Sequence, residues 1–291
     1  MVQRVQKIVS HVAPRHMDDW LSVAFLVSEI GIADVEYIGF QDVPDSYIND
    51  KDIMLVDIGM SYDRALNNYD HHQDSESPCS FILIANDVLG NADIATSAVA
   101  RVIDAVDRVG PFRAGVRLNR AQLNKRRAMT LIDPVEYAEQ IADAYKVTAD
   151  TSDFNLFIER FWDMLPEDAR HIGWLLCIEE RRRIHSLVQE SVVMSRNGLK
   201  ILMVENNVSP YESELMYRHG FDFIVQRISQ NGTGRIKIAK DTSKHHAFSF
   251  ESVFPEADFH HKSGFITVID EGKIDVNCTV DRLLRRSTTP P

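Results

Sequence analysis

The sequence predicts an α/β protein with an N-terminal parallel-sheet domain, a helical connector and a smaller C-terminal mixed α/β domain. Over the first 150 residues, short β-branched runs alternate with segments whose apolar residues recur at helical spacing. A mainly helical region follows, and the last part holds strand-like runs joined by turns. Strands that alternate with helices favour a parallel sheet, because parallel strands need a long crossover connection. The expected divisions are residues 1–150, 151–197 and 198–291.

The N-terminal domain is expected to begin with a strand over residues 7–12, KIVSHV. A helix follows over residues 18–31, where Gly31 ends an apolar pattern of helical period. The domain contains neither GxGxxG after a strand nor GxxxxGK[ST], so a dinucleotide fingerprint and a Walker-type loop are both absent. Further strands are expected at residues 34–40 and 52–59, and helices at 80–90 and 95–110.

The rest of the chain is expected to change from helices to strands near residue 197. The pattern is mainly helical from Asp133 to Arg196 and includes a long helix over residues 174–195. Asn197-Gly198 marks its end. Strands are then expected over residues 199–205, 221–229, 234–240 and 265–270.

Composition favours a cytoplasmic globular protein. No apolar run reaches the ~20 residues that cross a bilayer, and the N-terminal residues lack the pattern of a signal peptide. The 3 cysteines stand far apart and form no C-x-x-C, which argues against disulfides and a zinc-thiolate site. The net charge of −11 argues against a protein that coats duplex DNA.

One stretch departs from this acidic average. No acidic residue lies between Asp107 and Asp133, whereas basic residues are frequent there. The stretch is either a solvated basic loop or a phosphate-facing rim beside an acidic, metal-holding cleft, and the sequence leaves both readings open. Its basic residues are Arg108, Arg113, Arg117, Arg120, Lys125, Arg126 and Arg127.

Histidine and aspartate gather where the expected strands end. Random placement of 11 histidines in 291 residues would give ~0.4 adjacent pairs, whereas the sequence has His71-His72, His245-His246 and His260-His261. Each residue alone could cap a turn, start a helix or sit in the core. Together they favour a divalent-metal site, because ligands gather at the carboxyl ends of parallel strands. The residues concerned are His11, His16, Asp18, Asp19, Asp57, Asp70, His71, His72, Asp104 and Asp107.

Three motifs in this region resemble the DHH phosphoesterase superfamily. They are H-x4-H-x-D at 11–18, V-D-I-G at 56–59 and Y-D-H-H-Q at 69–73. That superfamily includes RecJ-type exonucleases, nano-RNases, cyclic-dinucleotide phosphodiesterases and family II pyrophosphatases. The chain most resembles its melanocyte-proliferating-gene branch of metal-dependent RNA exonucleases. The features that indicate this branch are His16, the short interval from Asp57 to Asp70, I-D-A-V-D-R-V-G at 103–110, S-P-Y-E-S-E-L at 209–215 and F-H-H-K-S-G-F at 259–265.

The resemblance implies two divalent metal ions, with Mn²⁺ expected and Mg²⁺ or Co²⁺ as alternatives. It implies that His11, His16 and Asp57 hold one ion. Asp18, His71 and Asp107 would hold the other, with Asp57 as the bridge. Asp70 would orient His71, and His72 would face the scissile phosphate. From the smaller domain, His261, Ser263 and Gly264 would close over the phosphate, while Arg108 and Arg113 would make further phosphate contacts.

The sequence departs from the pattern of this branch at three places. Val12-Ala13 replaces the usual Asn-Gly after the first histidine. The fourth motif reads Asp107-Arg108-Val109-Gly110 instead of ending in Asp-Asn-Gly, which leaves Asp104 as an alternative ligand. Near the C-terminus, Thr267-Val268-Ile269 replaces a continuation that contains glycine and lysine.

The resemblance implies a two-metal phosphodiesterase that acts as a 3′–5′ exonuclease on RNA or short single-stranded oligonucleotides. The acidic net charge agrees with a short or single-stranded substrate. Two other classes stay open: hydrolysis of a small phosphate compound, such as a cyclic dinucleotide or pyrophosphate, and a non-catalytic metal-containing module that binds nucleic acid. No membrane partner is expected, and the sequence leaves a homodimer open.

Overall fold

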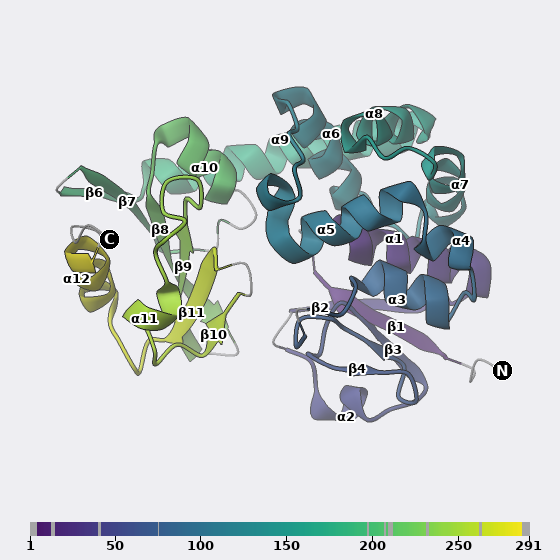
Figure 1. Cartoon of the computed structure of the whole chain (residues 1–291), viewed down its shortest axis with the longest axis horizontal. Helices are drawn as coiled ribbons and strands as arrows, with labels where there is room; N and C mark the ends of the chain where they lie inside the picture. The colour runs from purple at the N-terminus through teal and green to yellow at the C-terminus, as the bar shows by residue number, and fades with distance from the viewer. Residues whose placement is uncertain are drawn as a thin grey trace. The chain divides into compact units, whose positions relative to one another are not determined.

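The computed structural model describes residues 5–12, 15–39, 42–74, 76–196, 198–206, 208, 212–230, 233–261 and 264–286 (Figure 1). The side chains of residues 112, 113, 213, 214, 217, 218, 230 and 286 are outside this description. Contacts divide the chain into two compact units, Met1–Ile178 and Glu179–Pro291. The three-part division expected from the sequence stays a prediction.

The first unit is built on a five-stranded sheet in the order β2-β1-β3-β5-β4. β1 pairs in parallel with β2 and β3, β3 pairs in parallel with β5, and β4 runs antiparallel at the edge. The predicted α/β class and its N-terminal parallel sheet are therefore confirmed. The strands are β1 (Lys7–His11), β2 (Val35–Ile38), β3 (Ile53–Val56), β4 (Tyr62–Asp63) and β5 (Asn68–Tyr69).

Neighbouring residues of the central strands point to opposite faces of this sheet, and both faces are covered. Ile8 and Val56 pack with the helical side, where α1 and α3 lie (Figure 1). Val9 and Leu55 pack on the other side, against the segment that holds α2. The helices concerned are α1 (Met17–Phe25), continued by the π-helical turn Leu26–Ile30, α2 (Asp45–Ile48) and α3 (Ser80–Asp87).

A layer of helices completes the first unit. Aromatic side chains such as Trp20, Tyr145 and Phe161 are fully buried between these helices. Burial of each large apolar side chain stabilises the fold by roughly 1.5–3 kcal/mol. Gly110 interrupts α5 with a φ of 79°, near the point where the sequence predicted that helix to end. The helices are α4 (Ala92–Ala95), α5 (Ala98–Arg113), α6 (Arg120–Leu131), α7 (Ala138–Thr148), α8 (Phe154–Met164) and the first half of α9 (Glu167–Gln189), which continues past Ile178 into the second unit.

The second unit contains a six-stranded mixed sheet in the order β10-β11-β9-β8-β7-β6. β7 and β8 are parallel, and the other pairs among the described strands are antiparallel. The predicted mixed α/β character is confirmed. Its elements are β6 (Val192–Arg196), β7 (Leu199–Val204), α10 (Glu212–His219), β8 (Phe223–Gln230), β9 (Thr233–Lys240), α11 (Phe250–Val253), β10 (Phe259–His260), β11 (Ile266–Asp270) and α12 (Val276–Arg286).

One predicted element is wrong. The long helix was expected to run to Ser195, but α9 ends at Gln189, and β6 pairs with β7 from Val192 to Arg196. The adjacent β-branched residues Val192 and Val193 favour a strand. The strand depends on pairing with β7, which a local helical pattern does not contain. The prediction therefore placed the end of the helix too late. Across the described chain, no helix is long and apolar enough to span a bilayer.

Candidate metal centre

Three strand ends bring the predicted ligands to one edge of the first sheet. β1 ends at His11, β3 ends one residue before Asp57, and β5 ends one residue before Asp70. Because β1, β3 and β5 run in the same direction, their carboxyl ends share this edge. The alternation of strand and helix in the sequence therefore assembles residues that lie far apart along the chain.

Two helices supply the remaining side chains. His16 is the N-terminal cap residue of α1, and Asp18 and Asp19 lie in its first turn, where the helix dipole favours negative charge. All the residues of α1 from Met17 to Phe25 are buried, so these two carboxylates are drawn into the protein. Asp107 comes from α5, and its carboxylate lies 3.2 Å from Nδ1 of His16.

Asp57 adopts an unusual backbone conformation. Its φ is 56°, in the left-handed region, which costs a residue with a Cβ roughly 1–2 kcal/mol. Its backbone N–H donates to the carbonyl of Tyr69, and Ser80 Oγ donates to its Oδ1 at 3.0 Å. Strain of this kind persists where the surroundings hold it in place, and it clusters at functional sites.

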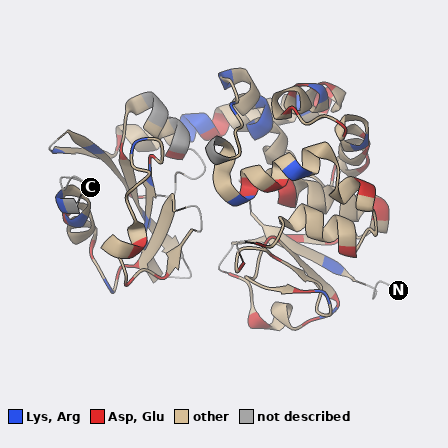
Figure 2. Ribbon diagram, in the orientation of Figure 1, with Lys and Arg blue, Asp and Glu red and all other residues tan. Residues whose placement is uncertain are grey.

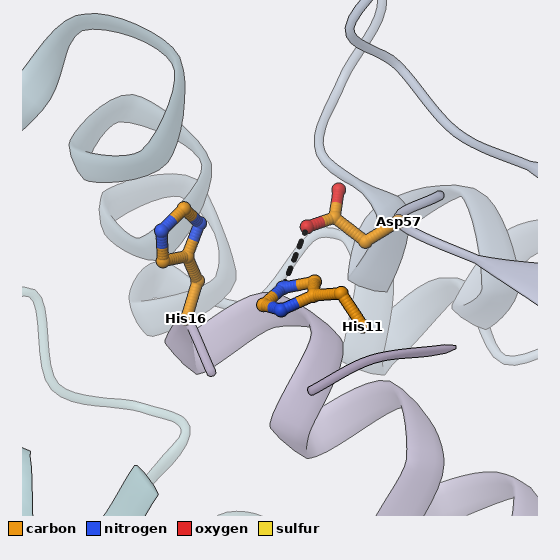
Figure 3. Close-up of side chains that lie close together, drawn as sticks. All are labelled: His11, His16 and Asp57. Carbon is orange, nitrogen blue, oxygen red and sulfur yellow. Dashed lines mark ion pairs between the residues drawn. The ribbon is translucent and has the colours of Figure 1, made fainter. Parts of the chain in front are cut away.

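His11, His16 and Asp57 form one group whose ligand atoms all lie within 4.8 Å of one another (Figure 3). His11 Nε2 lies 3.6 Å from Asp57 Oδ2, and the rings of His11 and His16 meet edge to face at 5.6 Å. Nδ1 of His11 is 3.0 Å from the carbonyl of Val12. A proton on Nδ1 would donate to this carbonyl and leave Nε2 free to bind a metal, as is usual for metal-ligating histidines.

A second group surrounds His71. Its Nε2 lies 2.9 Å from Asp107 Oδ2 and 3.3 Å from Asp57 Oδ1. Asp18 joins two further groups, one with His16 and Asp107 and one with Asp19 and Asp57. The structure thus brings together the six residues predicted as metal ligands, with Asp57 at the centre. Their assignment as ligands stays a proposal.

The burial of these carboxylates tests whether cations fit. Asp18, Asp19 and Asp57 have no exposed surface. Within the described chain, neither oxygen of Asp18 or Asp19 accepts a hydrogen bond. Burying an uncompensated carboxylate costs several kcal/mol. Carboxylate oxygens and imidazole nitrogens without thiolates suit Mn²⁺, Mg²⁺ or Co²⁺. The residues therefore fit divalent cations.

The pKa values respond to the same charges. Burial raises the pKa of Asp18 well above its usual value, and Asp107 and Asp57 add to the rise. Burial lowers the pKa of His11, but Asp19 and a hydrogen bond with Asp57 outweigh it and raise the pKa to about 9. Burial also lowers the pKa of His71, but hydrogen bonds with Asp107 and Asp57 outweigh this effect and raise the pKa to about 10. Without metal, protons take the places that cations would fill.

Asp70 holds a different histidine from the one expected. Its Oδ1 accepts from the backbone N–H of His72 and lies 2.7 Å from His72 Nδ1, and its Oδ2 accepts from the Met60 N–H. We expected Asp70 to orient His71. Nδ1 of His72 lies 2.7 Å from Asp70 Oδ1 and 3.7 Å from Asp57 Oδ1, whereas Nε2 of His71 lies against Asp107 and Asp57.

The fourth motif offered two aspartates, and the structure brings one of them to the site. Asp107 lies against His16 and His71. Asp104 instead accepts from the backbone N–H of Cys79 and from Nε and Nη2 of Arg108. Arg108, predicted to bind substrate, is thus already held by a carboxylate. The side chain of Arg113 lies outside the described residues.

The predicted residues of the smaller domain lie in the second unit. His261 follows β10, its ring lies 4.5 Å from that of Phe265, and its backbone N–H donates to Ile266. Gly264 has a φ of 70° and donates its N–H to the carbonyl of His261. Ser263 is outside the described residues. Closure of these residues over the phosphate stays a prediction.

One contributor to the site was noted in the sequence without a role, and another was missed. Asp19 lies 3.2 Å from Nε2 of His11, and Ser80 supports Asp57. Asp19 was noted in the turn but not assigned, although its place next to Asp18 in a buried first turn was a usable signal. Ser80 begins α3, 23 residues after Asp57, and no local pattern connects the two.

The family model MYG1_exonuc, described as Uncharacterised protein family (UPF0160), matches residues 7–79. The search of curated proteins found no significant match.

Several solved structures are similar at low identity. The pGpG-specific phosphodiesterase PggH of Vibrio cholerae is 11% identical, with a TM-score of 0.47 over 98% of this chain and 97% of that chain. RecJ of Thermus thermophilus in complex with Mn²⁺ is 10% identical, with a TM-score of 0.41 over 99% and 53%. An exopolyphosphatase-related protein of Bacteroides fragilis is 13% identical, with a TM-score of 0.45 over 97% and 92%.

The family match covers the segment that supplies His11, His16, Asp57 and the Asp70-His71-His72 run. The same segment folds so that these side chains meet at one edge of a parallel sheet. The family model thus matches about a quarter of the chain, in the segment that carries the motifs resembling DHH phosphoesterases.

Proposed function

We propose that this protein is a two-metal phosphodiesterase that shortens RNA or short single-stranded oligonucleotides from the 3′ end. The observation that carries the proposal is the buried Asp18 carboxylate, which meets His16 and Asp107 but accepts no hydrogen bond within the described chain. A protein that tolerates such a charge needs a cation in that place. Mn²⁺ is the expected ion.

The residues divide into two ligand sets around a shared aspartate. His11, His16 and Asp57 would hold one cation. Asp18, His71 and Asp107, again with Asp57, would hold the second. When bound, such a pair of ions supplies a nucleophile at neutral pH and offsets charge on the phosphoryl group. Ser80 keeps the Asp57 carboxylate in position for both sets.

His72 is the proposed proton donor. The carboxylate of Asp70 can only accept, so Nδ1 of His72 must carry the proton that it shares with Asp70. Burial lowers the pKa of His72, but Asp57 and the hydrogen bond with Asp70 outweigh it, so the net shift is upward. The protonated ring can donate from Nε2 to a phosphate oxygen or to the leaving hydroxyl.

A second candidate function is hydrolysis of a small phosphate compound, such as a cyclic dinucleotide or pyrophosphate. Basic side chains extend along α6 (Figure 2). Part of this charge is already used, since Arg108 binds Asp104 and Lys125 binds Glu159. A rim neutralised in this way attracts a long polyanion less strongly, which favours a small substrate.

Hydrolysis of a 5′-labelled single-stranded RNA ladder with Mn²⁺ tests the proposal. We would compare wild type, His71→Ala and His171→Ala, because His171 is an exposed histidine of the same unit. A ladder that shortens from the 3′ end in wild type and His171→Ala, and is lost in His71→Ala, is the expected result. Parallel reactions contain a cyclic dinucleotide and pyrophosphate. Turnover of these alone supports the second candidate, and silence on all substrates with metal bound contradicts both.

A further inference from the structure

A buried arginine stands beside the metal-binding residues without a conventional partner. Arg15 directly precedes His16, and 8% of its surface is exposed. Within the described ranges it forms no hydrogen bond or ion pair, and its Nε is buried without an acceptor. Its contact is the ring of Tyr37, whose centre lies 4.1 Å from the guanidinium carbon.

Tyr37 provides a fixed support for this guanidinium. It belongs to β2, where it is paired with Ser10 of β1, and its hydroxyl donates to Asp133 Oδ1 at 3.0 Å. Stacking of a guanidinium on an aromatic face satisfies the face of the group but not its N–H donors, which point outward in the guanidinium plane. Arg15 is therefore positioned by Tyr37 while its donors lack an acceptor in the described chain.

Arg15 is next in sequence to the metal-binding cluster. It precedes His16, the cap residue of α1, whose first turn holds Asp18 and Asp19. Asp19 itself lies against His11, at 3.2 Å from its Nε2, and forms no ion pair with Arg15 within 4.0 Å among the described pairs. Arginine stays charged in proteins, so its burial without an anion is costly. An anion that enters the site from outside would remove this cost.

We propose that Arg15 binds an oxygen of the substrate phosphate beside the metal centre. The ligand class is a phosphate group, because the planar fork of a guanidinium matches two phosphate oxygens. Arg15 is then a specificity-determining residue that selects a phosphate at this edge of the sheet, and Tyr37 is its positioning residue. The inference rests on the proposed function, since that function supplies the phosphate.

Binding of inorganic phosphate to Mg²⁺-loaded protein, measured by isothermal titration calorimetry, tests this assignment without turnover. Arg15→Met removes the charge and keeps an unbranched apolar side chain, whereas Arg15→Lys keeps a point charge without the fork. Arg101→Met is the matched control, because Arg101 is an exposed arginine of the same unit. We expect phosphate affinity to fall roughly 10–100-fold in Arg15→Met, less in Arg15→Lys and not at all in Arg101→Met.

Metal affinity and thermal stability separate binding from packing. Arg15→Met should keep the wild-type affinity for Mg²⁺ and unfold at the same or a higher temperature, because it removes a buried charge without an acceptor. An unchanged phosphate affinity in a folded, metal-binding Arg15→Met protein overturns the inference. If Arg15→Met does not fold, an Arg15→Lys protein with wild-type phosphate affinity overturns it equally. Absence of hydrolysis on every substrate would contradict the proposed function and leave this binding result intact.

Discussion

The Asp18→Asn protein should be more stable than wild type without metal and less stable than wild type with metal. Asparagine has nearly the shape of aspartate but carries no charge. Asp18 is fully buried, and neither of its oxygens accepts a hydrogen bond in the described chain. In chelator at neutral pH, the substitution removes a buried carboxylate surrounded by Asp19, Asp57 and Asp107. We expect Asp18→Asn to be more stable than wild type by roughly 1–3 kcal/mol under these conditions.

Metal should invert this difference. An ion at 100 times its dissociation constant stabilises wild type by about 2.7 kcal/mol, whereas Asp18→Asn has lost one ligand and gains less. Thermal unfolding with chelator and with Mn²⁺ measures both effects, at ~2–4 °C per kcal/mol. Asp163→Asn, which changes an exposed aspartate of the same unit, should shift neither midpoint.

The stability difference between Asp18→Asn and wild type should also depend on pH. Because the folded-state pKa of Asp18 is raised, its contribution to stability is fully present below its unfolded value, near 3.8, and is lost as pH rises through the folded value. The advantage of Asp18→Asn in chelator should therefore be absent in acid and grow toward neutral pH. An Asp18→Asn protein less stable than wild type in chelator at neutral pH would refute the reasoning, since Asp18 would then be compensated by the histidines around it.

The contacts of the site give four further predictions. Ser80→Ala removes the hydroxyl that donates to Asp57 and should weaken Mn²⁺ binding roughly 10–100-fold without unfolding the protein. Calorimetry measures this affinity, and an unchanged value would argue against a supporting role for Ser80. The pKa values of His11 and His71 are raised to about 9 and 10, so both rings are protonated at pH 7 without metal. Binding should therefore release at least two protons, one from each ring, as calorimetry in buffers of different ionisation enthalpy can measure. Affinity should rise from pH 6 to pH 8, and pH-independent affinity would contradict this assignment. In the metal-free protein the same raised values stabilise the fold fully below pH ~6.5, and this contribution is lost as pH rises through 9 to 10, which urea unfolding with chelator tests. Asp70→Asn replaces an acceptor-only group by one that must donate, so it should cost roughly 1–3 kcal/mol and lower turnover. Bound metal, measured by elemental analysis, should stay at the wild-type level; loss of metal would instead place Asp70 among the ligands.

The sequence alone determined much of the first sheet and its ligand edge. The β-branched runs around Ile8 and Met54 give buried parallel strands, and parallel strands place their carboxyl ends together whatever the details of packing. His11, Asp57 and Asp70 could therefore be located from local pattern, because each lies at or one residue beyond a strand end.

Tertiary structure decided which of several neighbouring polar residues enters the site. Asp104 and Asp107 are about one helical turn apart on α5, and both could face the sheet. The choice depends on how α5 packs, which leaves Asp104 to Arg108 and brings Asp107 to His71. The partner of Asp70 was decided in the same way, by the direction of the chain after β5.

The remaining differences also come from contacts distant in sequence. Ser80 reaches Asp57 because α3 packs on the sheet, and β6 exists because β7 offers it a hydrogen-bonding edge. Local propensity identifies strands, helices and ligand-capable residues, because it depends on a few neighbouring positions. The selection among equivalent donors depends on side-chain direction and on partners far along the chain, which only the folded protein brings within reach.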